Sequence, residues 1–204
     1  MNPHTDDSSK NFVLIRHAES LQNKCWNESK QWSYRRYDKE FVDCDLSENG
    51  YEQTLLAREA VKNLKVKIVY VSPLRRALLT AREVFKNHPS NPKFIVVPIL
   101  REKLAAACDV PSDIEKLMKE FPDYDFSLVL KETKNKFLWC LDSFEDEDFT
   151  EELRAEIQQK GIEGDMDKIQ DYLLDRLAAI EPASLESEEE LISRCFRSKR
   201  YLIE

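Results

Sequence analysis

Three short runs of mostly apolar residues stand in the first half of the chain, at 12–15, 67–72 and 94–99. Each is rich in β-branched or aromatic side chains and has the length of a strand buried on both faces. Between the runs, apolar residues recur every three or four positions over 47–64 and 74–85, which predicts two amphipathic helices. Strands that alternate with helices in this way predict an α/β domain with a mostly parallel sheet.

The second half of the chain has a different pattern and is expected to be mainly helical. A proline-led cap predicts a helix over 111–119, and apolar residues at helical spacing predict another over 169–180. Ser187, followed by three glutamates, predicts the capped start of a last helix. We therefore expect one three-layer α/β/α domain over 11–204, with a helical insertion at about 103–186.

Three further segments carry weaker signals. Residues 1–10 are polar and are expected to form a disordered tail. Residues 121–126 (FPDYDF) predict a turn with aromatic anchors. The acidic residues over 142–156 are expected to form a solvated helix face.

Composition excludes several classes of protein. The 204 residues carry a net charge of −8 with a pI near 5.1, which speaks against broad nucleic-acid binding. No apolar run approaches the roughly 18 residues of a membrane span, and the polar N-terminus is no signal peptide, so we expect a cytoplasmic protein. The five scattered cysteines form no CxxC pair, which argues for reduced thiols and against structural zinc. With only three glycines, a phosphate site would have to be built from side chains.

Charged residues follow each of the three predicted strands. Arg16 and His17 end the first run, Arg76 starts the helix after the second, and Glu102 follows the third. The carboxyl ends of parallel strands meet at one sheet edge, where ligands bind. There, arginines could offset phosphoryl charge, a neutral imidazole could attack phosphorus, and a carboxyl group could protonate the leaving oxygen. The alternative is a surface turn at Arg16-His17 and ordinary ion pairs at Arg76 and Glu102.

The polar and aromatic stretch 24–41 also has two interpretations. It contains two tryptophans, two tyrosines, Arg35 and Arg36. It could be a surface loop whose rings pack on the body of the protein. It could instead be a lid over the sheet edge, with its arginines facing an anion.

LIRHAES, followed by SPLRRALLTA, resembles the histidine phosphatase superfamily, also called phosphoglycerate mutase-like. The family pattern is Arg-His-Gly-Glu, an Asn several residues on, Asp-x-x-Leu-Thr-x-x-Gly, and Ser-Pro-Leu-x-Arg-Ala-x-x-Thr-Ala. The chain matches it at the following positions: Arg16, His17, Glu19, Asn23, Asp45, Leu46, Gly50, Gln53, Ser72, Pro73, Leu74, Arg76, Ala77, Thr80 and Ala81. Ala18 stands where the family usually has glycine.

The resemblance implies a role for each matching site residue. His17 would be the nucleophile that accepts the phosphoryl group, and Glu102 would be the proton donor. Arg16 and Arg76 would bind the phosphoryl group, and Asn23 would line the site beside it. The resemblance implies a phosphoglycerate mutase-like fold, a small phosphorylated substrate, and neither metal nor cofactor.

The family pattern ends with an apolar strand running into Ser/Thr-His-Gly, whose histidine helps hold the phosphoryl group. The resemblance places that strand between the first and second strands of the sheet. Neither His4 nor His88 follows an apolar strand. Three interpretations stay open: a truncated form, an inactive member that binds a phosphorylated ligand or a protein partner, or a stub of strand at 201–203 with another group replacing the histidine.

The function expected from the sequence is phosphomonoester hydrolysis or phosphoryl transfer through a phosphohistidine on His17. Plain phosphatase action is favoured over phosphoglycerate mutase action, because a mutase must retain the phosphoryl group and exclude water.

Overall fold

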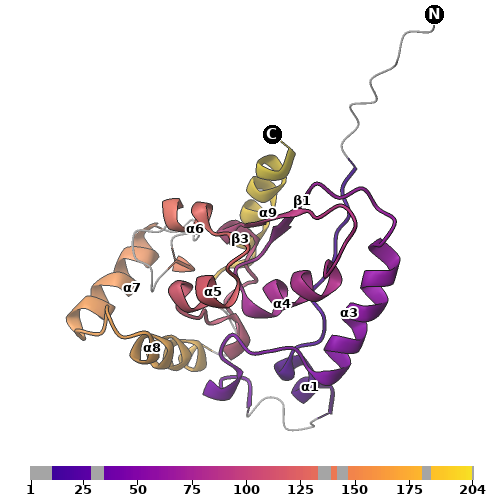
Figure 1. Cartoon of the computed structure of the whole chain (residues 1–204). Helices are drawn as coiled ribbons and strands as arrows, with labels where there is room; N and C mark the ends of the chain where they lie inside the picture. The colour runs from indigo at the N-terminus through magenta and orange to yellow at the C-terminus, as the bar shows by residue number, and fades with distance from the viewer. Residues whose placement is uncertain (1–10, 29–34, 133–138, 142–146, 181–184, 204) are drawn as a thin grey trace, which may run out of the picture.

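The computed structural model describes residues 11–28, 35–132, 139–141, 147–180 and 185–203 (Figure 1). The elements within these ranges are α1 (Leu21–Glu28), η1 (Lys39–Phe41), α3 (Glu48–Val61), β1 (Ile68–Val71), α4 (Arg75–Val84), β2 (Lys93–Val96), η2 (Pro98–Leu100), η3 (Ala107–Asp109), α5 (Ile114–Glu120), β3 (Tyr124–Asp125), α6 (Ser127–Glu132), α7 (Glu147–Gln159), α8 (Met166–Ala179) and α9 (Glu188–Ile203). No helix within these ranges is long and apolar enough to cross a membrane.

The sheet of the described residues has three parallel strands in the order β1-β2-β3. Ile68 pairs with Lys93 at one end of β1 and Val71 with Val96 at the other, while Phe94 of β2 pairs with Tyr124 of β3. Helix α4 packs against β1 and α6 against β2. In Figure 1 the sheet lies between α4 and α5 below and α6 and α9 above. The predicted layered α/β fold with a parallel sheet is thus confirmed.

Local capping fixes where the helices begin. Ser47 precedes α3, and its hydroxyl accepts a hydrogen bond from the N–H of Gly50. Asp113 caps α5 in the same way. At α9, Ser187 and Glu190 exchange side-chain-to-backbone hydrogen bonds, which is the capping box expected from the sequence.

The prediction of a buried strand at 12–15 is wrong. These residues belong to no strand, and Phe12 and Leu14 are 52% and 91% exposed. A strand forms only where neighbouring strands complete its backbone hydrogen bonds. The resemblance places a further strand between this segment and β1, yet no residue in the described ranges pairs with the segment. The apolar run therefore has β-forming residues without a strand partner.

The interpretation of 201–203 as a stub of strand is also wrong, because these residues continue helix α9. Residues 121–126 do more than turn, since Tyr124 and Asp125 form β3. The expected aromatic contacts are present: the ring of Tyr124 stacks on that of Phe94 at 4.5 Å. Residues 1–10 lie outside the described ranges.

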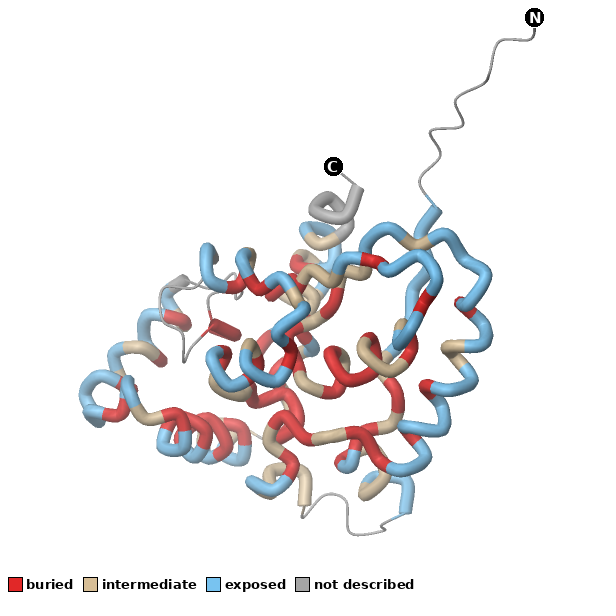
Figure 2. The backbone as a smooth tube through the Cα atoms, in the orientation of Figure 1, coloured by how far each residue is buried: buried red, intermediate tan, exposed pale blue. Residues whose placement is uncertain are grey.

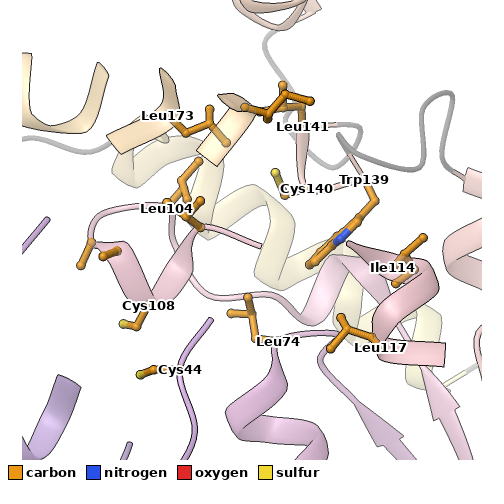
Figure 3. Close-up of a cluster of buried hydrophobic side chains, with 14 of the residues drawn as sticks. Cys44, Leu74, Leu104, Cys108, Ile114, Leu117, Trp139, Cys140, Leu141 and Leu173 are labelled. Carbon is orange, nitrogen blue, oxygen red and sulfur yellow. The ribbon is translucent and has the colours of Figure 1, made fainter. Parts of the chain in front are cut away.

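The core extends from the sheet into the helical insertion. Figure 2 shows buried residues in both α4 and α8, and both helices contribute to one buried hydrophobic cluster. Figure 3 shows Leu104 between Leu74, beside α4, and Leu173 of α8, with the ring of Trp139 to one side; all four belong to one buried cluster. The indole of Trp139 is buried and its N–H donates to the carbonyl of Ser112 at 3.2 Å. This bond joins the segment around Trp139 to the residue before the cap of α5.

Candidate functional site

The segment that carries His17 is held by backbone contacts to α3 and α4. The N–H of Ala18 donates to the Thr80 hydroxyl at 3.0 Å, and the N–H of Glu19 donates to the side-chain oxygen of Gln53 at 2.9 Å. The carbonyl of Glu19 accepts from the N–H of Ser47 at 2.9 Å. These bonds fix the turn after His17 although the preceding apolar run is no strand.

His17 is half-buried, and its imidazole has a defined hydrogen bond. Nδ1 lies 2.8 Å from the carbonyl oxygen of Ala18. Because a carbonyl only accepts, Nδ1 carries the proton in this contact, and Nε2 then carries the lone pair. Burial and the nearby Arg76 guanidinium lower the pKa of His17 from 6.5 to about 4. The ring is therefore neutral at pH 7, as a nucleophilic imidazole must be.

Arg76 lies at the start of α4, directly after the strand β1 and its proline. It is only 3% exposed. Its Nη2 donates to the carboxylate of Asp109 at 2.9 Å, and its Nη1 donates to the carbonyl of Cys108. Burial opposes the charge on Arg76, but Asp109 more than offsets this and raises the pKa of the guanidinium. Arg76 thus stays charged at every relevant pH.

Glu102 follows η2 at the end of β2 and is exposed to solvent. Its Oε1 accepts from the N–H of Lys103 at 2.8 Å. Both Glu102 and Arg16 act electrostatically on His17, Glu102 in the direction that raises its pKa and Arg16 in the direction that lowers it. Arg16, Arg76 and Glu102 therefore all lie within electrostatic reach of His17.

Asn23 is placed differently from the other four. It lies in α1, and its side-chain oxygen accepts from the N–H of Ser20 at 3.3 Å while its own N–H donates to the Ser20 hydroxyl. Its side chain therefore binds the backbone at the start of α1 in this structure. Arg16 is exposed and precedes His17 directly.

A buried triad fixes the loop that carries Glu102. The carboxylate of Glu186 accepts from Arg101 at 3.0 Å and from Arg194 of α9 at 2.7 Å. Arg194 also donates to the backbone carbonyls of Ile99 and Arg101. These bonds tie α9 and the end of the insertion to the residue next to Glu102. Nothing in the sequence signalled this triad, because its members lie up to 93 positions apart.

His88, the other histidine within the described ranges, does not lie beside His17. His88 is buried after α4, where its Nε2 lies 3.1 Å from the carbonyl oxygen of Val61. His4 falls outside the described ranges. Within those ranges, no group of three or more His, Cys, Asp or Glu side chains gathers in a way that could hold a metal ion.

The two arginines of the stretch 24–41 are engaged with protein groups. Arg35 donates to Asp38 at 2.9 Å and lies over the ring of Phe41. Arg36 donates to the carbonyl of Ala105 at 3.1 Å. Residues 29–34 of this stretch lie outside the described ranges. In the described part Tyr37 packs against the core, whereas Trp26 is 57% exposed and residues up to Glu28 form helix α1, so the surface-loop interpretation holds only in part.

The fold and site define an α/β protein with a neutral histidine, a buried arginine and a carboxylate at one sheet edge. The chain belongs to the histidine phosphatase superfamily (branch 1), whose family model matches residues 12–126. The 2,3-bisphosphoglycerate-dependent phosphoglycerate mutase of Chlamydia muridarum is 35% identical over 79 residues, and that of Chlamydia abortus is 33% identical over the same length. Each match covers 39% of this chain and 30% of the relative, so the chain matches less than a third of these enzymes. No solved structure matches the chain significantly.

Proposed function

We propose that this protein cleaves phosphate monoesters, or transfers their phosphoryl group, through a phosphohistidine on His17. The observation that carries this proposal is the half-buried, neutral imidazole of His17 beside the charged guanidinium of Arg76. A neutral ring near pH 7 is a nucleophile, and a buried guanidinium stabilises the charge that develops on phosphoryl oxygens.

In the proposed first step, Nε2 of His17 attacks phosphorus and the bond from phosphorus to the ester oxygen breaks. Glu102 gives its proton to the leaving oxygen, so the alcohol departs neutral. The Nδ1 proton, bound to the Ala18 carbonyl, holds the ring in the tautomer that this step needs. Arg16 and Arg76 offset the charge on the phosphoryl oxygens. Asn23 lies on α1, the helix that follows His17 in the sequence. Water then attacks phosphorus and gives a proton to the Glu102 carboxylate, the bond to Nε2 breaks, and inorganic phosphate leaves.

Phosphoglycerate mutase action is the second candidate, because the relatives carry that name. The two functions share the phosphohistidine and differ in its fate. A phosphatase passes the phosphoryl group to water, whereas a mutase returns it to a phosphoglycerate. Release of inorganic phosphate from 3-phosphoglycerate, measured beside formation of 2-phosphoglycerate, separates them.

The test is hydrolysis of p-nitrophenyl phosphate from pH 5 to 8 by the wild type and His17→Ala. Removing the nucleophile should lower turnover by about 10⁴-fold or more, as loss of a nucleophile does in other covalent enzymes. Trapping with a ³²P-labelled ester should give a label on His17 that is lost in acid and kept in alkali. His88→Asn is the matched control, since His88 binds Val61 away from the site and should keep the label.

Equal activity of the wild type and His17→Ala would contradict the proposal. So would a folded wild type that neither hydrolyses the ester nor takes up label, which is the outcome expected of an inactive member that binds a phosphorylated ligand.

A further inference from the structure

Asp109 is a buried carboxylate to which the sequence analysis assigns no role. It lies at the end of η3 and is 8% exposed. Its Oδ1 accepts from Nη2 of Arg76 at 2.9 Å, and its Oδ2 accepts from the N–H groups of Ala105 and Ala106 at 3.3 and 3.0 Å. One carboxylate therefore joins the guanidinium to the loop that begins at Glu102.

This loop is itself fixed to the helix that follows His17. The N–H of Cys108 donates to the side chain of Gln22 in α1 at 2.8 Å, and the N–H of Ala107 donates to the carbonyl of Arg36 at 3.1 Å. The amide of Gln22 also donates to that carbonyl of Arg36 at 2.9 Å. Gln22 is almost fully buried, so these bonds are shielded from water. Asp109 consequently binds Arg76 from a loop that is fixed to α1, and not from α4 itself.

The charged residues near Asp109 are residues of the candidate phosphoryl site described above. Arg76 lowers the pKa of His17, and Glu102 acts on Asp109 in the direction that raises its pKa. Asp109 thus lies within electrostatic reach of Glu102 and in contact with Arg76. Because the ion pair between Arg76 and Asp109 is almost wholly removed from water, loss of either partner would leave an uncompensated buried group.

We propose that Asp109 is the positioning residue of the phosphoryl site, holding the Arg76 guanidinium where it meets the phosphate. This inference rests on the proposed function of His17 and Arg76. Two of the guanidinium nitrogens donate to Asp109 and Cys108, and these two bonds fix the orientation of the guanidinium plane.

The opposing view is that Asp109 occupies Arg76 and competes with phosphate. The two views predict opposite effects of removing its charge. If Asp109 positions Arg76, its loss weakens phosphate binding, because the guanidinium loses its fixed direction. If Asp109 competes, its loss strengthens phosphate binding, because an internal anion is removed.

The experiment is calorimetric titration of the full chain with inorganic phosphate at neutral pH. Asp109→Asn should weaken binding by about 10-fold or more, the range of one charge-assisted hydrogen bond, and Asp109→Ala should weaken it further because no acceptor remains. Circular dichroism and the thermal midpoint of each variant establish the folded fraction. The dissociation constant per folded molecule is a quantity that a purely structural role would not move.

Asp43→Asn is the matched control. Asp43 is equally buried and lies close enough to act on Arg76, but its carboxylate accepts from the backbone N–H groups of Arg75 and Ser112. Asparagine also tolerates the positive φ of 41° at this position. Phosphate affinity should stay within about twofold of wild type in this variant, since the guanidinium keeps its partner.

Arg76→Ala separates failure of the inference from failure of the proposed function. If wild type binds phosphate, Arg76→Ala does not, and Asp109→Asn binds as tightly as wild type or more tightly, the positioning role is overturned while the phosphate site stands. If wild type does not bind phosphate, or if Arg76→Ala binds it equally well, the proposed phosphate site is wrong. The positioning role of Asp109 is then wrong too.

Discussion

The hydroxyl of Thr80 accepts a hydrogen bond from the N–H of Ala18 at 3.0 Å and donates one to the carbonyl of Arg76 at 2.7 Å. One side chain thus connects the residue after His17 to the first turn of the helix that carries Arg76. The two functional side chains come from segments about 60 positions apart, and this hydroxyl is a direct connection between them.

Thr80→Val should therefore uncouple the two segments. Valine keeps the shape of threonine but leaves the buried N–H of Ala18 without its acceptor, which costs about 1–3 kcal/mol of unfolding free energy. The proposed phosphatase activity should fall as well, because His17 loses its fixed place. Urea unfolding and ester hydrolysis measure the two effects. Thr80→Ser keeps the hydroxyl and is the control. A Thr80→Val protein as stable and as active as the wild type would show that the hydrogen bond does not matter.

Gly50 permits the close approach of α3 to the His17 turn. A Cβ at this position would lie 2.1 Å from the carbonyl oxygen of Glu19, which is backbone and cannot move aside alone. Gly50→Ala should destabilise the protein by about 1–3 kcal/mol or more, as overpacking does, and should displace the turn. Gly164→Ala is the matched control, since nothing lies within 4 Å of the added Cβ. Urea unfolding curves of the two variants compare them directly, and equal midpoints would refute the close contact.

His17 should titrate near pH 4 instead of near its ordinary value of 6.5, because burial and Arg76 disfavour its charged form. NMR titration of the imidazole measures this midpoint. If the proposed mechanism holds, kcat/KM should keep its value as the pH falls from 7 to 5, since the nucleophile stays neutral. A midpoint near 6.5 would contradict the buried environment described for the ring.

The same shift affects stability. Between pH 6.5 and about 4, the unfolded chain binds a proton on His17 that the folded protein does not bind. The free energy of unfolding therefore falls as the pH falls through this window, and His17 has no such effect above it. The difference in stability between wild type and His17→Asn isolates the effect, because the other titrating groups are common to both proteins.

Glu186 neutralises charge between two buried arginines. Glu186→Gln should cost about 3–5 kcal/mol of unfolding free energy, because Arg101 and Arg194 would face each other with their shared carboxylate removed. Glu59→Gln is the control, since Glu59 pairs with Lys62 on the open surface of α3 and should leave stability unchanged. Thermal and urea unfolding test the pair. Equal stability of both variants would mean that the triad contributes nothing to the fold.

Sequence reasoning succeeded where the signal is local. Helices α3, α4 and α8 fall within a few residues of the predicted ranges, because each has an apolar face at helical spacing and a cap or proline at its start. The strands β1 and β2 were predicted for a related reason, since each lies between clear breakers. Arg16, Arg76 and Glu102 do act electrostatically on His17, although the run before His17 forms no strand and its turn is held by α3 and α4 instead.

Sequence reasoning failed where the answer depends on a distant partner. The run 12–15 has the composition of a strand, but strand formation needs a neighbour, and composition does not record one. The pairing of Asp109 with Arg76 was missed because the two residues lie 33 positions apart. Asn23 lies in the expected region, but its side chain is used by the start of α1, which the motif alone could not reveal.

The exposed run 12–15 also has a consequence for handling the protein. Four consecutive uncharged side chains with β-forming character are 40–91% exposed. Such segments from separate molecules can stack into ordered aggregates, and natural proteins guard them with charge. In concentrated solution, aggregation should therefore start through contacts between these segments. Val13→Lys should raise the solubility of the protein.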